Sequence, residues 1–244
     1  MKLTQWQARS TTEVPRAQIE FVRGGRAARL DALDVVNVPF ETVDRVRVPA
    51  SWKHKQSYEG FYWAATIGAH VWFESLYERA ALMRIDRDGD VVGIAAQPMW
   101  IHWSHLGSKH APDFFVRYRD ERGMLIDVKP EPNIGEEDAA TFSLTSALCA
   151  QLGWGYAVIS DISAQEHRNL RFLSGYRYPR WRTDRVDVRL HERVGDRHSL
   201  TDWAELLDRV CEQPLGAVYS ALWWGRLDFD VRTSLSLAAG ATAV

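Results

Sequence analysis

The sequence has few features that would place the protein in an oxidising compartment or in a membrane. Two cysteines among 244 residues, Cys149 and Cys211, are too few for a disulfide framework and form no Cys-x-x-Cys pair. The amino terminus lacks the basic, apolar and small-residue pattern of a secretory signal. The apolar stretch 61–73 is too short to span a bilayer. We therefore expect a cytoplasmic protein with no membrane role.

Bulk positive charge is also absent, because the formal net charge is -2. This balance argues against binding to polyanions through overall charge and leaves room for local basic patches only. Hydrophobic residues make up 46% and charged residues 25% of the chain, as in ordinary soluble globular proteins. The length allows one large domain or two small ones.

The pattern of residues predicts three regions along the chain. Residues 1–43 have weak periodicity, and we expect a loosely structured, peripheral segment there. Residues 44–175 and 176–244 are expected to form an α/β domain and a small C-terminal domain. In the first domain we expect strands at 58–63, 91–94, 99–103 and 154–160 and helices at 71–84, 136–153 and 163–173. In the second we expect helices at 200–212 and 218–224 and a strand at 227–231.

Charged residues are set into two adjacent apolar segments, 110–118 and 124–130, which are separated by a polar turn. Side chains two apart on a strand share a face, so Asp127 and Lys129 point the same way. If the turn closes a hairpin, Asp113 lies opposite Asp127 and Lys129. Two carboxylates and an ammonium then converge at one place.

Such a group of charges needs compensation when it is buried. Carboxylates at this spacing suit Mg²⁺, which takes oxygen ligands and often shares them with a substrate phosphate. Lys129 could then orient the attacking water and neutralise charge at the phosphate, which is the chemistry of phosphodiester hydrolysis. A solvated hairpin with alternating polar residues is the other interpretation. His102, His105 and His110 lack the companions and spacing of a zinc site.

A third acid could come from the predicted helix 71–84, which carries Glu74 and Glu78 on one face. Glu78 is the first choice and Glu74 the alternative. Ser75 and Glu78 also match a capping box, in which Glu78 would serve only the helix terminus.

A basic stretch lies between His167 and His198, where nine arginines alternate with aromatic residues. Such a surface could follow a phosphate backbone, and a charged connecting surface is the alternative. The residues we select as DNA-binding are Arg168, Arg171, Arg177, Arg180, Trp181 and Arg182.

The joint order of these segments resembles the PD-(D/E)xK nucleases, and more closely the TnsA-like endonuclease subunit of heteromeric transposases. The resemblance covers about residues 57–175. It rests on a helix with Phe73-Glu74-Ser75-Leu76-Tyr77-Glu78-Arg79, on the segment 88–98, on His110-Ala111-Pro112-Asp113-Phe114 and on Ile126-Asp127-Val128-Lys129. It implies a restriction-endonuclease-like core with a mixed central sheet flanked by helices. It also implies a small, mostly helical C-terminal module that could be winged-helix-like.

The resemblance also implies an activity. The chain would be a Mg²⁺-dependent DNA endonuclease, with Mn²⁺ as a possible substitute, that cuts at transposon ends. Its partners would be a DDE-type, TnsB-like transposase subunit and a TnsC-like ATPase regulator. By position, Glu78 would be the helical acid, Asp113 and Asp127 metal ligands, and Lys129 the catalytic lysine, with Gln97 nearby.

Two other functions stay open at this point. One is a free-standing restriction- or repair-type nuclease with the same core. The other is a catalytically idle DNA-binding or assembly module on the same fold. The combination of Asp113, Asp127 and Lys129 argues against an idle module, because a scaffold does not need it.

Overall fold

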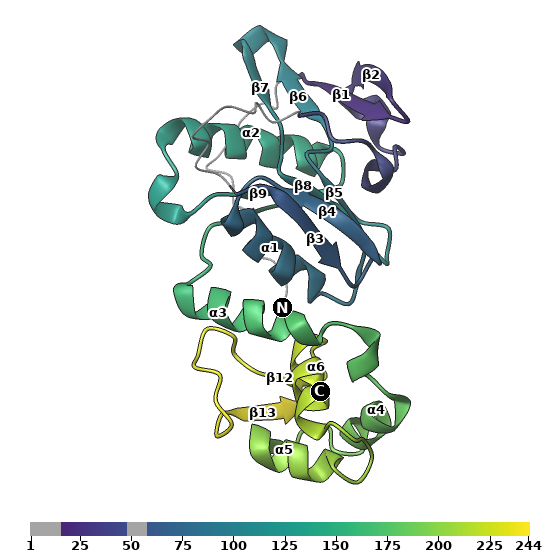
Figure 1. Cartoon of the computed structure of the whole chain (residues 1–244). Coiled ribbons are helices and arrows are strands. Elements are labelled where there is room, and N and C mark those ends of the chain that lie inside the picture. Colours follow the sequence, from purple (N-terminus) through teal and green to yellow (C-terminus); the bar gives the residue numbers. More distant parts are fainter. Residues whose placement is uncertain (1–15, 48–57) are drawn as a thin grey trace. The chain divides into compact units, whose positions relative to one another are not determined.

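A computed structural model describes residues 16–47 and 58–244 (Figure 1). The chain divides into two compact units, each with its own contacts. The first comprises the described residues up to Leu82 together with Asp90–Asp161, and the second comprises Met83–Gly89 and Ile162–Val244. Apart from Met83–Gly89, the second unit begins at Ile162, and the expected domains 44–175 and 176–244 stay a prediction. No helix in the described ranges is long and apolar enough to cross a membrane.

The first unit is built on a mixed four-stranded sheet, as the fold class requires. Its strands run in the order β10, β9, β8, β5. The pair β9 and β10 is parallel, and the pairs β8–β9 and β5–β8 are antiparallel. The bounds are Val91–Ala96 for β5, Phe114–Tyr118 for β8, Gly123–Val128 for β9 and Gly155–Ile159 for β10.

The predicted hairpin is confirmed as β8 and β9. Phe114 pairs with Ile126 and Arg117 with Gly123. A side chain at Gly123 would meet the Phe115 ring at 2.7 Å, which explains the glycine at the start of β9. Extending the register by one residue sets Asp113 opposite Asp127, at the open end of the hairpin.

The predicted helix 71–84 begins later than its apolar spacing suggested. Residues 71–73 belong to strand β4 (Ala69–Phe73), which pairs with β3 (Gly60–Ala64), and helix α1 covers Leu76–Asp86. Val71 and its aromatic neighbours favour a strand. Ser75 then starts the helix, because its hydroxyl oxygen accepts a hydrogen bond from the backbone N–H of Glu78 at 3.1 Å.

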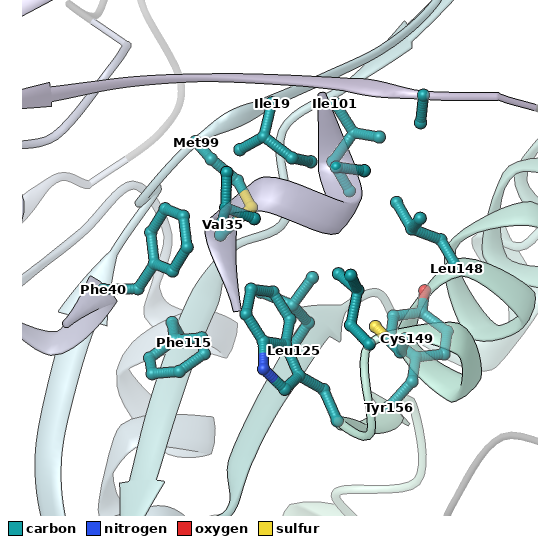
Figure 2. Packing of buried hydrophobic residues seen from close by; sticks show 14 of the residues in the cluster. Ile19, Val35, Phe40, Met99, Ile101, Phe115, Leu125, Leu148, Cys149 and Tyr156 are labelled. Atoms are coloured by element: carbon teal, nitrogen blue, oxygen red, sulfur yellow. The ribbon is translucent and has the colours of Figure 1, made fainter. Parts of the chain in front are cut away.

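Helix α2 (Glu136–Gln151) covers one face of the central sheet and closes the main core, of which Figure 2 shows a part. The three aromatic rings of Phe40, Phe115 and Trp154 meet there at centroid distances of 5.4–5.7 Å. The core draws on strands, helix and amino-terminal segment, as the labelled residues of Figure 2 show: Ile19, Val35, Phe40, Met99, Ile101, Phe115, Leu125, Leu148, Cys149 and Tyr156.

The amino-terminal segment differs from the peripheral one that we expected for residues 1–43. Its described part forms β1 (Gln18–Arg23), β2 (Arg26–Asp31) and two short 3₁₀ turns, Ala32–Val35 and Phe40–Thr42. These strands join β6 (Trp100–Trp103) and β7 (Ser108–His110) in a second sheet of order β2, β1, β6, β7. Ile19 and Phe40 are fully buried, so this segment is part of the core.

The second unit is mostly helical, with a small antiparallel sheet of order β11, β13, β12. Helix α5 ends at Leu207, five residues before the expected end, and only the first two residues of the expected strand 227–231 pair. The helices are α3 (Ala164–Leu173), α4 (Asp184–His191), α5 (Leu200–Leu207) and α6 (Pro214–Trp223), and the strands are β11 (Arg197–Ser199), β12 (Leu227–Asp228) and β13 (Gly240–Ala243).

A buried ion pair stabilises the second unit. Arg84, near the end of α1, donates from Nε and Nη2 to the two carboxylate oxygens of Glu166 at 2.9 and 2.8 Å. Their side chains are 5% and 0% exposed. Arg232 Nε also lies 3.7 Å from the Glu166 carboxylate. Breaking a buried ion pair of this kind by removing one partner is strongly destabilising, so the second unit depends on both residues.

Candidate active site

Asp113 and Asp127 meet at the open end of the β8–β9 hairpin. Asp113 precedes β8, and its Oδ2 accepts a hydrogen bond from the backbone N–H of Val128 at 2.7 Å. Burial raises the pKa of Asp113 well above the usual carboxyl range, and the negative charges of Asp127 and Glu78 raise it further. The hairpin therefore holds two carboxylates against their mutual repulsion.

Asp127 is held by donors from two other strands. Nε2 of His110, on β7, lies 2.9 Å from its Oδ2 and 3.1 Å from its Oδ1. The hydroxyl of Tyr156, on β10, donates to Oδ2 at 2.5 Å. Burial, and then the charge of Asp127, raise the pKa of Tyr156 well above its usual value, so the phenol keeps its proton. The two donors thus fix the carboxylate of Asp127 and supply hydrogen bonds to a residue that is only 3% exposed.

Lys129, one residue beyond β9, is paired with Asp138 in the first turn of α2. Its Nζ lies 2.6 Å from Asp138 Oδ1, and Asp138 Oδ2 accepts from the backbone N–H of Gly135 at 2.9 Å. The hydrogen bond from Lys129 is the main cause that lowers the pKa of Asp138. The ammonium is therefore tied to the amino terminus of α2.

Of the two acids expected on the helix 71–84, Glu78 lies in the first turn of α1 and Glu74 lies between β4 and α1, outside the helix. Glu78 is buried, and its carboxylate accepts from the backbone N–H of Glu74 at 2.7 Å and from the Ser75 hydroxyl at 3.0 Å. Burial raises the pKa of Glu78. Oε2 of Glu74 lies 3.5 Å from Nη2 of Arg47. The helix-capping contacts suggested as the alternative for Glu78 are present, while its charge is still close enough to influence Asp113.

The carboxylates, the lysine and several other polar groups line one open cleft with a cavity volume of about 330 Å³. Lys109 Nζ lies 4.5 Å from the ring centroid of Trp100 at this cleft. Acidic and basic groups therefore share the lining, as binding of a phosphate together with a cation requires. The lining includes Arg47, Trp100, Lys109, His110, Asp113, Asp127, Lys129 and Asp138.

Gln97, which the resemblance placed near the site, supports the strand that carries Asp113. Its backbone N–H donates to the carbonyl oxygen of Asp113 at 2.8 Å. Its φ of 44° is uncommon for a residue with a side chain. In the described part of the chain, neither polar atom of its buried side chain has a hydrogen-bond partner. The backbone at Gln97 thus fixes the start of β8.

The six residues selected as DNA-binding lie in the second unit and are not equivalent. Arg168, Arg171, Arg180 and Arg182 are exposed. Arg177 is 9% exposed, and its Nη1 donates to the carbonyl oxygen of Ser174, so it is a structural residue rather than a surface cation. Trp181 is half-buried, with Nε1 donating to Gly175 O at 3.2 Å and Arg180 over its ring.

The oxygen donors of the cleft suit a divalent cation that binds few protein ligands. Among the described residues, no three or more acidic, histidine or cysteine side chains surround one point as a complete metal site. Mg²⁺ commonly takes only one or two protein carboxylates and completes its shell with water and phosphate oxygens. A cation would also offset the repulsion that raises the pKa of Asp113. Asp113 and Asp127 therefore fit a cation bound in this way.

Three residues that contact Asp127 or Lys129 are not among the site residues expected from the sequence. His110 enters the sequence analysis as a zinc ligand, although its place in the segment before Asp113 sets it beside Asp127. Asp138 lies in the first turn of α2 and pairs with Lys129. Tyr156 had no local signal, because its contact with Asp127 depends on the parallel pairing of β9 and β10.

Comparison with protein families gives one match. Residues 88–161 match the family described as TnsA-like endonuclease N terminal. The matched segment includes Asp113, Asp127 and Lys129, and Glu78 lies before it. No curated protein matches the chain.

Proposed function

We propose that this chain is the metal-dependent DNA endonuclease subunit of a heteromeric transposase, and the match of residues 88–161 to the TnsA-like endonuclease family supports this proposal. The chain would hydrolyse a phosphodiester bond at transposon ends. The observation that carries the proposal is that Asp113 and Asp127 lie together in one cleft, which Lys129 also lines. The backbone N–H of Val128 holds the Asp113 carboxylate there.

In this proposal Asp113 and Asp127 bind Mg²⁺, which Mn²⁺ could replace. When bound, the cation would polarise the phosphate and lower the pKa of a bound water. The Lys129 ammonium, fixed by Asp138, would donate to a phosphate oxygen and stabilise the negative charge that develops there. The open cleft leaves room for the phosphate beside these groups.

Glu78 is proposed as the helical acid of the site, with Glu74 as the alternative. The influence of Glu78 on the pKa of Asp113 supports this choice. Glu74 is less suited, because Arg47 already pairs with it. Replacing Glu78 by Gln removes the charge and keeps one acceptor oxygen, so only one of the contacts with Ser75 and the Glu74 N–H is retained, and a loss of cleavage in Glu78→Gln would reflect the missing charge together with that lost contact.

The DNA would enter the cleft along its basic rim, where Lys109 and Arg47 lie. We further propose that exposed cations of the second unit contact DNA beyond the cleft. Arg168, Arg171, Arg180 and Arg182, with Trp181 beside them, remain suited to this role, and Arg177 does not because it is buried.

The proposed partners are a DDE-type, TnsB-like transposase subunit and a TnsC-like ATPase regulator, acting with this chain on DNA in the cytoplasm. The TnsA-like domain supports this proposal.

A cleavage assay tests the function. The purified chain is incubated with Mg²⁺ and DNA that carries the ends of its own mobile element, with and without the transposase subunit. Asp113→Ala should abolish cleavage while the protein stays folded. The matched control is Asp120→Ala, because Asp120 is an exposed acid in the turn of the same hairpin. Cleavage of unrelated DNA without a partner would instead indicate a free-standing nuclease.

A further inference from the structure

The carboxylate of Asp127 lies between two hydrogen-bond donors that come from different sheets. Tyr156 approaches from β10, the parallel neighbour of β9, and His110 from β7 of the second sheet. Both contact Oδ2, at 2.5 and 2.9 Å, while among the described residues Oδ1 has only the longer contact of 3.1 Å with His110. Oδ1 is thus the oxygen with more remaining capacity to accept.

The side chain of Tyr156 is buried in the core and does not face solvent. The residue is 3% exposed, and its ring packs in the main core near Leu148 and Cys149, as Figure 2 shows, with Phe142 at a centroid distance of 6.4 Å. A buried hydroxyl needs a hydrogen-bond partner, and the carboxylate of Asp127 supplies it. Packing of the ring therefore sets the direction of one bond to Asp127.

His110 is held in a comparable way at the cleft. Its ring lies edge-on to Phe142 at a centroid distance of 6.4 Å, and its side chain is 16% exposed. Donation to Asp127 requires the proton on Nε2. The two donors together leave the carboxylate of Asp127 little freedom to rotate.

From this geometry we infer that Tyr156 and His110 are positioning residues, which hold Asp127 so that Oδ1 faces a divalent cation. The inference rests on the proposed metal-dependent function. Neither residue needs to touch the cation or the DNA. Donors of this kind behind a metal ligand commonly change metal affinity about 10- to 100-fold when they are removed.

The test is a titration of the full-length protein with Mn²⁺ in the absence of DNA, followed by calorimetry. Tyr156→Phe removes one hydroxyl and keeps the packed ring, and we expect Mn²⁺ affinity to fall at least about tenfold. Tyr118→Phe is the matched control, because Tyr118 is also a buried tyrosine of the central sheet but its hydroxyl lies 3.8 Å from the sulfur of Met124. Its affinity should stay within about twofold of the wild type.

Two further variants examine the second donor. His110→Leu removes the donor and should weaken Mn²⁺ binding, whereas His110→Gln keeps an N–H group and should recover part of the affinity. Because both donors hold one carboxylate, the effects of Tyr156→Phe and His110→Leu should not be additive.

The outcomes separate this inference from the proposed function. Equal Mn²⁺ affinity in Tyr156→Phe and the wild type would overturn the inference, even if Tyr156→Phe melts at a lower temperature. Equal losses in Tyr156→Phe and Tyr118→Phe, or a wild type that binds no Mn²⁺, would also overturn it. A wild type that binds Mn²⁺ through Asp127 but cuts no DNA would defeat the proposed function and leave the positioning role intact.

Discussion

Replacing Asp113 by Asn should make the metal-free protein more stable. The structure places this carboxyl group in a partly buried position beside Asp127 and Glu78, and these surroundings raise its pKa well above the usual range. An asparagine can still accept the hydrogen bond from the Val128 N–H, because it keeps a side-chain oxygen. The substitution thus removes the repelled charge and keeps the contact.

The size of the effect depends on how far the pKa of Asp113 is raised. At neutral pH we expect Asp113→Asn to unfold at a higher temperature than the wild type, because the substitution removes a buried charge that Asp127 and Glu78 repel. For a chain of this length each kcal/mol corresponds to a rise of about 2–4 °C in melting temperature. The measurement is thermal unfolding in the presence of a chelator.

The pH dependence has a defined sign. Because folding raises the pKa of Asp113, the folded protein binds this proton more tightly than the unfolded chain does. Wild-type stability is therefore lost as the pH rises from the ordinary carboxyl value of about 4 through the raised value. The advantage of Asp113→Asn should grow over this interval and vanish below it.

A divalent cation should reverse the order of thermal stability between the wild type and Asp113→Asn. Mg²⁺ or Ca²⁺ should raise the melting temperature of the wild type and leave that of Asp113→Asn unchanged, because binding to the folded state stabilises it. Asp120→Asn, in the exposed hairpin turn, is the control and should respond as the wild type does. If Asp113→Asn is no more stable than the wild type in chelator at neutral pH, the description of a strained carboxylate pair is wrong.

Three other changes probe the remaining parts of the account. Asp138→Asn should slow DNA cleavage about 10- to 100-fold, because Lys129 loses the carboxylate that fixes it, while DNA binding measured in Ca²⁺ is not weakened. Lys109→Ala should weaken DNA binding. It should also lower the slope of log affinity for DNA against log salt concentration by about one. Glu166→Ala should destabilise the second unit by about 3–5 kcal/mol, measured by denaturant unfolding, because it breaks the buried ion pair with Arg84.

Two of these changes have a matched control. Arg29→Ala, at an exposed position of β2, should leave the salt dependence of DNA binding unchanged, and equal effects of Lys109→Ala and Arg29→Ala would exclude a specific contact at the cleft. Glu192→Ala is the control for Glu166→Ala, because it breaks an ion pair with Arg189 in which the Glu192 side chain is 55% exposed. We expect its free energy of unfolding to fall by less than about 1 kcal/mol. Undiminished cleavage in Asp138→Asn would show that Lys129 needs no fixed position.

The central hairpin was predictable because its information is local. Apolar alternation, a polar turn and the two charged positions lie within residues 110–130, and the resulting register brings Asp113 opposite Asp127. The helix start was not predictable from apolar spacing, because Phe73 fits both the helical pattern and strand β4. The pairing of β4 with β3 decides between them.

Contacts between distant segments account for most of the other differences. Ile19 joins the core because β1 pairs with β6, about eighty positions later in the chain. Tyr156 reaches Asp127 only through the parallel pairing of β9 and β10. Arg177 resembled its exposed neighbours in the basic stretch, and only the packing after α3 shows that it is buried. Local patterns carry no information on such burial.

The measurement that tests the central claim most directly is the rate at which the wild type and Asp113→Asn cut transposon-end DNA in Mg²⁺ with the transposase partner present. The account predicts cleavage by the wild type and by Asp120→Asn, and none by Asp113→Asn although it is folded. Cleavage by Asp113→Asn at the wild-type rate would contradict the assignment of Asp113 and Asp127 as the active site.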